Sequence, residues 1–284
     1  MNRSITAIVP VLLAPLVAQA GVIRHDRDDS LYRGLADEPQ YASSLAIHSG
    51  GQPHCSGTLV ARDWILIAGH CTLAPDLTAV LGDGRSFSVA EVVVHPDYEP
   101  NQVSMDDLAL LRLDLPVSGL TPAVRYRGDD EIGHVATSVG YGATGDGLIG
   151  VVADGGTRRA GRNVIDSEDF LFGTEDTLMT DFDNPLDPGF SLIGDATPLD
   201  LEYLPAPGDS GGSMFIDVGG QTMLAGVHTA VGLLGRIPNH FFTYGDVLLF
   251  ERVSRYNDWI DGVIPEPSPI ALLAVGALFK LRRR

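Results

Sequence analysis

Three side chains in this sequence, those of His70, Asp107 and Ser210, could together make a serine hydroxyl nucleophilic. Ser210 lies in the stretch APGDSGGSMF, whose glycine and proline residues do not suit a regular helix or strand. A serine hydroxyl is a poor nucleophile unless a neighbouring imidazole accepts its proton, and a carboxylate must hold that imidazole in the right tautomer. The segments ILIAGHC and DDLALL supply an imidazole and a carboxylate beside apolar runs. The set therefore predicts catalysis by a serine nucleophile if the fold brings the three together.

The segments that must position these side chains are short apolar runs separated by Gly, Pro and Asp. Such runs predict antiparallel strands in a barrel or sandwich. One amphipathic helix is expected late in the chain, over 248–260, with Leu249, Val253, Tyr256 and Ile260 on one face. No linker before Pro265 separates two independent units. The expected strands lie within 44–50, 55–69, 87–96, 107–116, 134–142, 177–182 and 222–232.

The three motifs AGHC, DLALL and GDSGG occur in this order along the chain. Over about 40–262 the sequence resembles the trypsin/chymotrypsin family of serine peptidases. The resemblance implies an all-β fold of two antiparallel six-stranded β-barrels with a C-terminal helix. It also implies that Ser210 attacks the scissile carbonyl, that His70 acts as general base and then acid, and that Asp107 orients His70. Asp106 is a rival carboxylate, but the acid of the family directly precedes the apolar LALL.

Further residues receive roles from the same resemblance. The backbone amides of Gly208 and Ser210 would form the oxyanion hole, where one well-placed donor contributes about 3 kcal/mol to transition-state stabilisation. The only two cysteines, Cys55 and Cys71, would form the disulfide beside the histidine. A zinc site at the cysteines is not expected, because no further cysteine or clustered histidine completes a ligand set. We expect neither a metal nor a cofactor.

The residues expected around the substrate side chain depart from the trypsin pattern. Leu204 stands six residues before Ser210, where trypsin-like enzymes carry the aspartate that selects Arg or Lys, so cleavage after basic residues is not expected. His228 stands where glutamyl endopeptidases of the family carry a pocket histidine. If His228 has that role, the residue before the cut is Glu or Asp; if it is only structural, that residue is small or apolar. The strand expected to pair with the substrate backbone contains Thr229, Ala230 and Val231.

The N-terminal segment bears on how the site becomes active. Residues 1–20 have a basic start, an apolar stretch and a final AQA, as a signal peptide does, so the mature chain should begin at Gly21. Family members bury the acid before the serine, here Asp209, against a new N-terminal ammonium. The usual Ile-Val-Gly-Gly start is absent. The ammonium of Gly21, the side chain of Arg24 or an internal side chain could therefore pair with Asp209.

The C-terminal segment, 263–284, contains VIPEPSP, the apolar IALLAVGALF and the basic KLRRR. This order resembles the PEP-CTERM sorting signal of Gram-negative bacteria, which an exosortase recognises and cleaves. The resemblance implies transient membrane anchoring through the tail and delivery to the cell surface or extracellular matrix. Signal peptidase and an exosortase would be the processing partners of the domain at 21–262.

Charge and composition limit the remaining possibilities. The chain has 284 residues and a formal net charge of −18, which disfavours binding to nucleic acid or anionic lipid. The acidic stretch DFDNPLD, 181–187, could bind calcium, but it lacks the EF-hand pattern and a solvated acidic loop is the favoured interpretation. The sequence therefore predicts a secreted serine endopeptidase acting on proteins or peptides through an acyl-enzyme. The alternative is a surface or matrix binding protein that keeps the peptidase scaffold with little turnover.

Overall fold

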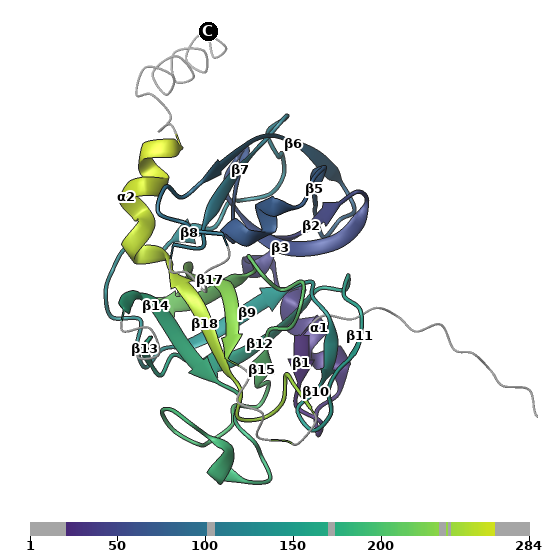
Figure 1. Cartoon of the computed structure of the whole chain (residues 1–284), viewed down its shortest axis with the longest axis vertical. Helices are drawn as coiled ribbons and strands as arrows, with labels where there is room; N and C mark the ends of the chain where they lie inside the picture. The colour runs from purple at the N-terminus through teal and green to yellow at the C-terminus, as the bar shows by residue number, and fades with distance from the viewer. Residues whose placement is uncertain (1–20, 101–105, 170–173, 233–236, 238–239, 265–284) are drawn as a thin grey trace, which may run out of the picture.

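The computed structural model describes residues 21–100, 106–169, 174–232, 237 and 240–264. Two β units lie one above the other (Figure 1), the first formed by strands β2 to β7 and the second by strands β8, β9, β12 to β14 and β16 to β18. Residues 1–20 and 265–284 are outside the described chain, so the predicted signal peptide and nearly all of the predicted sorting tail are as well. No helix among the described residues is both long enough and apolar enough to cross a membrane.

The first unit is a closed six-stranded barrel, as expected, with the strand order β2-β3-β4-β7-β6-β5. Its core contains Leu45, Leu59 and Ile65, all fully buried. A short 3-10 helix, η2 (Gly69–Leu73), follows the barrel strand β4 and carries His70. The barrel strands are β2 (Ser44–Ser49), β3 (Gln52–Ala61), β4 (Trp64–Ile67), β5 (Leu77–Val80), β6 (Ser86–Val94) and β7 (Ala109–Leu113).

The second unit differs from the expected six-stranded barrel, because it is an eight-stranded sheet whose described strands do not close. The strand order is β12-β9-β16-β17-β18-β14-β13, and β8 pairs in parallel with β17. The turn that contains Ser210 leads directly into β16. The strands are β8 (Val124–Arg125), β9 (Val135–Gly140), β12 (Arg159–Val164), β13 (Ser167–Asp169), β14 (Thr174–Asp181), β16 (Ser213–Val218), β17 (Gln221–Gly232) and β18 (Val247–Arg252).

A third, four-stranded sheet places the first described residues beside the second unit. Its order is β11-β10-β1-β15, where β1 (Gly21–Ile23) pairs in parallel with β10 (Thr144–Asp146) and antiparallel with β15 (Tyr203–Leu204). The remaining strand is β11 (Gly150–Ala153). The sequence did not predict this sheet, because three of its four strands contain only two or three residues.

The late helix, α2, begins later than predicted, at Val253, and ends at Val263. Residues 247–252 form β18 instead, hydrogen-bonded to β14 on one side and β17 on the other. Leu249 therefore lies in a strand, whereas Val253, Tyr256 and Ile260 are buried on the helix as expected.

Three short helices complete the described elements: α1 (Asp29–Ala36), η1 (Pro39–Tyr41) and η3 (Pro188–Phe190). The helix α1 begins after Asp28, whose carboxylate caps the amide of Ser30.

One apolar cluster joins the two β units to α2 and fixes their relative position. It is fully or nearly fully buried, and its members come from the first barrel, from the second sheet and from the helix. Because these groups pack between the units, the loops that leave the two β units on the same side are held against each other. Examples from the three sources are Leu66 and Leu110, Phe215 and Val227, and Val253 and Ile260.

Candidate active site

Asp107 holds His70 through two hydrogen bonds. One carboxylate oxygen of Asp107 accepts the backbone N–H of His70 at 2.8 Å, and the other lies 2.6 Å from Nδ1 of the imidazole. A carboxylate beside Nδ1 keeps the proton on that nitrogen, so Nε2 carries the lone pair that can accept a proton. Asp106 does not share this role, since its carboxylate lies 3.8 Å from His95.

Two further side chains fix Asp107, which is only 5% exposed. The hydroxyl of Thr229 donates to the carboxylate oxygen that faces the imidazole, at 2.7 Å. The backbone N–H of Asp107 points at the carboxyl group of Glu251, 3.3 Å away. The sequence placed Thr229 only in the substrate-pairing strand and gave no signal for Glu251, which comes from β18.

The turn that carries Ser210 is held by Ser56 of the first barrel. The backbone N–H of Ser56 donates to the carbonyl of Ser210 at 2.9 Å, and its hydroxyl donates to the carbonyl of Gly208 at 3.0 Å. The amide of Tyr141 in turn donates to the Ser56 hydroxyl oxygen at 2.9 Å. No motif marks Ser56, although its place directly after Cys55 could have suggested a position near the site.

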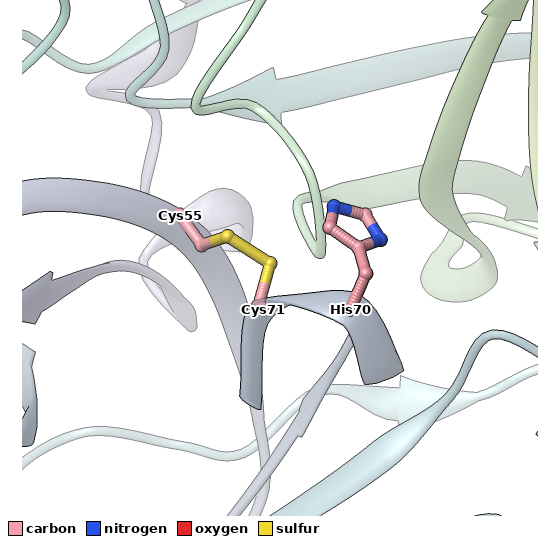
Figure 2. Close-up of side chains that lie close together, drawn as sticks. All are labelled: Cys55, His70 and Cys71. Atoms are coloured by element: carbon pink, nitrogen blue, oxygen red, sulfur yellow. A yellow bond between two sulfur atoms is a disulfide. The ribbon is translucent and has the colours of Figure 1, made fainter. Parts of the chain in front are cut away.

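The predicted disulfide between Cys55 and Cys71 is confirmed, with an S–S distance of 1.97 Å. Figure 2 shows it beside His70, whose imidazole projects from the short helix that also carries Cys71. The Cys71 sulfur lies 3.6 Å from the carbonyl oxygen of Ser210, so the disulfide touches the nucleophile turn as well. These sulfur and nitrogen atoms lie within 4.8 Å of one another, but paired sulfurs are not thiolate ligands and the group does not suit a metal.

The backbone at Gly208 and Ser210 has the properties of an anion-binding turn. Gly208 has a φ of +93°, a conformation that glycine adopts without steric cost. Neither the Gly208 amide nor the Ser210 amide donates a hydrogen bond within the described part of the structure. Two unused amides in one turn are available to a developing oxyanion. The described contacts include no hydrogen bond between His70 and the Ser210 hydroxyl. The donor–acceptor distance of a catalytic hydrogen bond is often long until substrate binds.

A cavity of about 170 Å³ opens beside Ser210. Among the described residues that line it there is no carboxylate, so these residues offer no partner for an arginine or lysine side chain. Leu204, which we expected at this position, is fully buried in β15 against β1 and does not line the cavity. The lining residues are Pro205, Ala206, Pro207, Ser210, His228, Thr229, Ala230, Val231 and Phe242.

Among the described residues that line this cavity, His228 is the one with an ionisable side chain. It is 3% exposed, and burial lowers its pKa to about 3, so the ring is neutral at physiological pH. Nδ1 lies 3.2 Å from the backbone carbonyl of Asp209 and must carry the proton. Nε2 therefore has only a lone pair, and it finds no hydrogen-bond partner among the described residues.

Asp209 is fully buried behind the nucleophile turn, and burial raises the pKa of its carboxyl to about 6. It accepts the amides of Gly142 at 2.7 Å and Ala206 at 2.9 Å, and the hydroxyl of Tyr203 at 3.3 Å. Arg24, one of the three candidates for its partner, instead binds a neighbouring carboxylate and a backbone carbonyl.

Gly21 lies beside Tyr203, whose hydroxyl binds this carboxyl group. A Cβ added to Gly21 would come within 2.2 Å of the Tyr203 hydroxyl, which is the group that binds Asp209. In the parallel register, Gly21 pairs with Thr144, two residues after the Gly142 amide that binds Asp209.

Comparison with known proteins supports this geometry. The family described as Trypsin matches residues 35–168, which include His70 and Asp107. Human serine protease 56 is 40% identical over 84 residues, covering 26% of this chain and 14% of that protein. Human kallikrein-10 is 32% identical over 149 residues, covering 43% of this chain and 51% of that protein. The chain thus spans about half the length or less of these two curated relatives.

Longer but more distant similarities cover most of the chain. Rat chymotrypsin-like elastase family member 1 is 27% identical over 242 residues, covering 78% of this chain and 83% of that protein. Among solved structures, neuropsin, a serine protease expressed in the limbic system of mouse brain, superposes with a TM-score of 0.62 at 19% identity, covering 80% of this chain and 96% of that one. Residues 35–168 are thus similar to the Trypsin family, the curated relatives are serine proteases or elastases, and the fold is trypsin-like.

Proposed function

We propose that the protein is a serine endopeptidase with Ser210 as nucleophile. The observation that carries the proposal is the pair of hydrogen bonds that His70 donates to Asp107, which leaves Nε2 free as a base. The Ser210 oxygen would attack the carbonyl carbon of a peptide bond while its proton passes to Nε2. That proton then goes to the leaving amine, and water hydrolyses the acyl-enzyme by the same route.

The free amides of Gly208 and Ser210 would stabilise the oxyanion that forms in both steps. The orientation of these amides toward the oxyanion depends on the two hydrogen bonds that Ser56 donates, because these fix the carbonyls of Gly208 and Ser210. A preorganised turn of this kind avoids reorganisation when charge develops, and one such donor is worth about 3 kcal/mol.

The cavity lining favours a small or apolar residue before the cut. An acidic side chain would find neither a positive charge nor a free N–H on His228, because Nδ1 already donates to the Asp209 carbonyl and Nε2 carries only a lone pair, unless the ring first takes up a proton. Because the pKa of His228 is about 3, that uptake is unfavourable near neutral pH. A peptide library should therefore show cleavage after small or apolar residues at pH 7. Preference for Glu or Asp at that pH would contradict this part of the proposal.

We also propose that 21–262 is the mature peptidase domain and that cleavage after residue 20 completes the site. An ammonium at Gly21 would lie beside the Tyr203 hydroxyl that binds Asp209, and it would add positive charge near this buried carboxyl, which forms no salt bridge among the described residues and otherwise interacts with the charge of Arg159. Support for export comes from the disulfide, which suits an oxidising compartment. The tail at 263–284 is proposed to be a PEP-CTERM signal on its sequence alone. Mass spectrometry of the two ends of the mature protein tests both assignments.

A fluorophosphonate tests the nucleophile, because the serine oxygen bonds to phosphorus as fluoride leaves. On a chain that starts at Gly21 we expect one label per chain, on Ser210. Substitution of His70 by alanine should slow labelling by at least about 100-fold. The two adjacent acids provide a matched pair. Asp107→Asn should lose about 10⁴-fold in peptide hydrolysis, whereas Asp106→Asn should stay near the wild-type rate.

Two outcomes would count against the proposal. If the folded chain starting at Gly21 takes no label, the binding-protein alternative gains and the peptidase proposal fails. If Asp106→Asn loses as much activity as Asp107→Asn, the assignment of the orienting carboxylate is wrong.

A further inference from the structure

Arg159 is a fully buried cation in the second unit. Its Nε binds one carboxylate oxygen of Asp29, in α1. The other oxygen of Asp29 binds Arg33 at 2.9 Å, so two arginines share one carboxylate and the group keeps an excess positive charge. The terminal nitrogens of Arg159, Nη1 and Nη2, have no hydrogen-bond partner among the described residues. A buried guanidinium with two unused nitrogens is costly unless a further negative charge lies near it.

The strand register places Arg159 on the face of the sheet where Asp209 lies. Arg159 in β12 is directly opposite Gly140 in β9. Directly opposed residues of an antiparallel pair project their side chains to the same face. A Cβ added to Gly140 would lie 2.0 Å from Oδ1 of Asp209, so the Asp209 carboxylate occupies that face. The guanidinium of Arg159 and the carboxylate of Asp209 therefore share one face of β9 and β12.

Tyr203 lies on the same face and contacts Asp209. A Cβ added to Gly161, two residues after Arg159 and so on the same face, would come within 2.2 Å of the Cβ of Tyr203. The hydroxyl of Tyr203 donates to Oδ2 of Asp209 at 3.3 Å, and burial raises its pKa well above the ordinary value, so it keeps its proton. Burial also raises the pKa of Asp209, and the charge of Arg159 opposes that rise.

The Asp209 carboxylate fixes the nucleophile turn through donors that carry no charge. The donors are the amides of Gly142 at 2.7 Å and Ala206 at 2.9 Å and the hydroxyl of Tyr203. The amide of Asp209 donates back to the carbonyl of Ala206 at 2.8 Å, which closes the turn. Hydrogen bonds to an ionised carboxylate are about twice as strong as those to a neutral acceptor. The turn is therefore fixed best while Asp209 is ionised.

Among the described residues, the other titratable groups near Asp209 do not supply a charge of their own. The ring of His228, from β17, contacts the backbone carbonyl of Asp209, and burial lowers its pKa to about 3, so the ring stays neutral near neutral pH. In a chain that starts at Gly21, the new ammonium lies beside the Tyr203 hydroxyl and acts on the same carboxylate as Arg159.

We propose that Arg159 is a positioning residue of the peptidase site. Its buried charge holds the carboxylate of Asp209 in the form that accepts hydrogen bonds from both amides, and the nucleophile turn thereby keeps its own amides directed at the oxyanion. Arg159 does not line the substrate cavity and acts only through Asp209. The inference rests on the proposed function, because the shape of this turn matters for chemistry at Ser210.

The pH dependence of fluorophosphonate labelling tests this role in chains that start at Gly21. Arg159→Met removes the charge, which should raise the pKa of Asp209 from about 6 by about two pH units, as expected for a nearby opposite charge. Asp209 of the variant would then be mostly neutral at pH 7 and mostly ionised at pH 9. We expect the wild type to label about tenfold faster than Arg159→Met at pH 7 and at a similar rate at pH 9. His70 and the Gly21 ammonium are present in both chains, so they do not produce this difference.

Two further variants separate the charge of Arg159 from its packing. Arg159→Lys keeps the charge and should restore the pH profile of the wild type. Asp29→Asn is the matched control, because it breaks the ion pair between Arg159 and α1 but leaves the charge of Arg159 in place. Its labelling rate relative to the wild type should not change with pH. An equal loss in Arg159→Met at pH 7 and pH 9 would overturn the proposal, since lost packing lowers the rate at every pH.

Unfolding in urea measures the same coupling without peptidase activity. A group with a raised folded pKa loses stability as the pH rises toward that value. The free energy of unfolding of Arg159→Met should therefore fall relative to the wild type between pH 6 and pH 9. This fall should be absent when both chains carry Asp209→Asn.

The two measurements distinguish the two proposals. If the relative fall in stability is absent, or persists with Asp209→Asn, the role of Arg159 is wrong whether or not the chain takes the label. If the fall is present and depends on Asp209 but the wild type takes no label, only the peptidase proposal fails. Arg159→Gln replaces Arg159→Met if circular dichroism shows that the methionine variant does not fold, and the same outcomes then apply.

Discussion

Substitution of Glu251 by glutamine should remove a large pH dependence from the stability of the fold. Glu251 lies directly behind Asp107 and is 1% exposed. One of its oxygens faces the amide of Asp107 at 3.3 Å, and the other accepts the hydroxyl of Tyr256 at 3.0 Å. Burial raises the pKa of Glu251 to about 8, from an ordinary value of 4.5. Glutamine can accept from the Asp107 amide without ever ionising.

The sign and size of the effect follow from this raised pKa. Below pH 4.5 the carboxyl is protonated in both the folded and the unfolded chain, so it has no effect. Between pH 4.5 and 8 the unfolded chain releases the proton while the folded chain keeps it, so the free energy of unfolding falls by about 1.4 kcal/mol per pH unit. From pH 5 to pH 9 the loss amounts to about 4 kcal/mol.

Urea unfolding of the wild type and of Glu251→Gln at pH 5 and pH 9 measures this loss. The other buried acids titrate in both proteins, so their contributions cancel in the difference. We expect Glu251→Gln to gain about 4 kcal/mol relative to the wild type between the two pH values. Glu38 is only half-buried, and Glu38→Gln should show no such gain. A constant difference between Glu251→Gln and the wild type would refute the argument, since Glu251 would then ionise normally.

Three further predictions concern the site. Thr229→Val removes the hydrogen bond to Asp107, so kcat should fall about tenfold, KM should change little and Thr229→Ser should restore the rate, as measured with a chromogenic peptide. Ser56→Ala removes the hydrogen bond to the Gly208 carbonyl and leaves the buried amide of Tyr141 unpaired. Fluorophosphonate labelling should slow, and the free energy of unfolding in urea should fall by about 1–3 kcal/mol. Replacing Cys55 and Cys71 by alanine should cost about 3 kcal/mol in the same assay, because the bridge spans 16 residues.

The sequence predicted the trypsin-like fold and the disulfide because motifs and cysteine number carry both. It misplaced the start of α2, because residues 247–252 are buried on every side and show no alternation that would separate a strand from a helix. Leu204 was assigned by counting back from Ser210. The short pairing of β15 with β1 places Leu204 in the core instead. No residue pattern predicts a strand of two residues.

The contacts of the nucleophile turn could not be predicted for a different reason. Ser56 and Glu251 act through hydrogen bonds to backbone groups distant in sequence, and such bonds carry no motif. Only coordinates show these features.

The strand β3 has a mechanical consequence for catalysis. Cys55 of this strand is disulfide-bonded to Cys71, in the helix that carries His70. The next residue, Ser56, donates hydrogen bonds to the turn of Ser210, which belongs to the second β unit. If the two halves rock against each other, the proton acceptor and the attacking oxygen travel with the same strand and keep their mutual spacing. Such motion would widen or narrow the substrate cleft, while the distance between the His70 imidazole and the Ser210 hydroxyl stays the same.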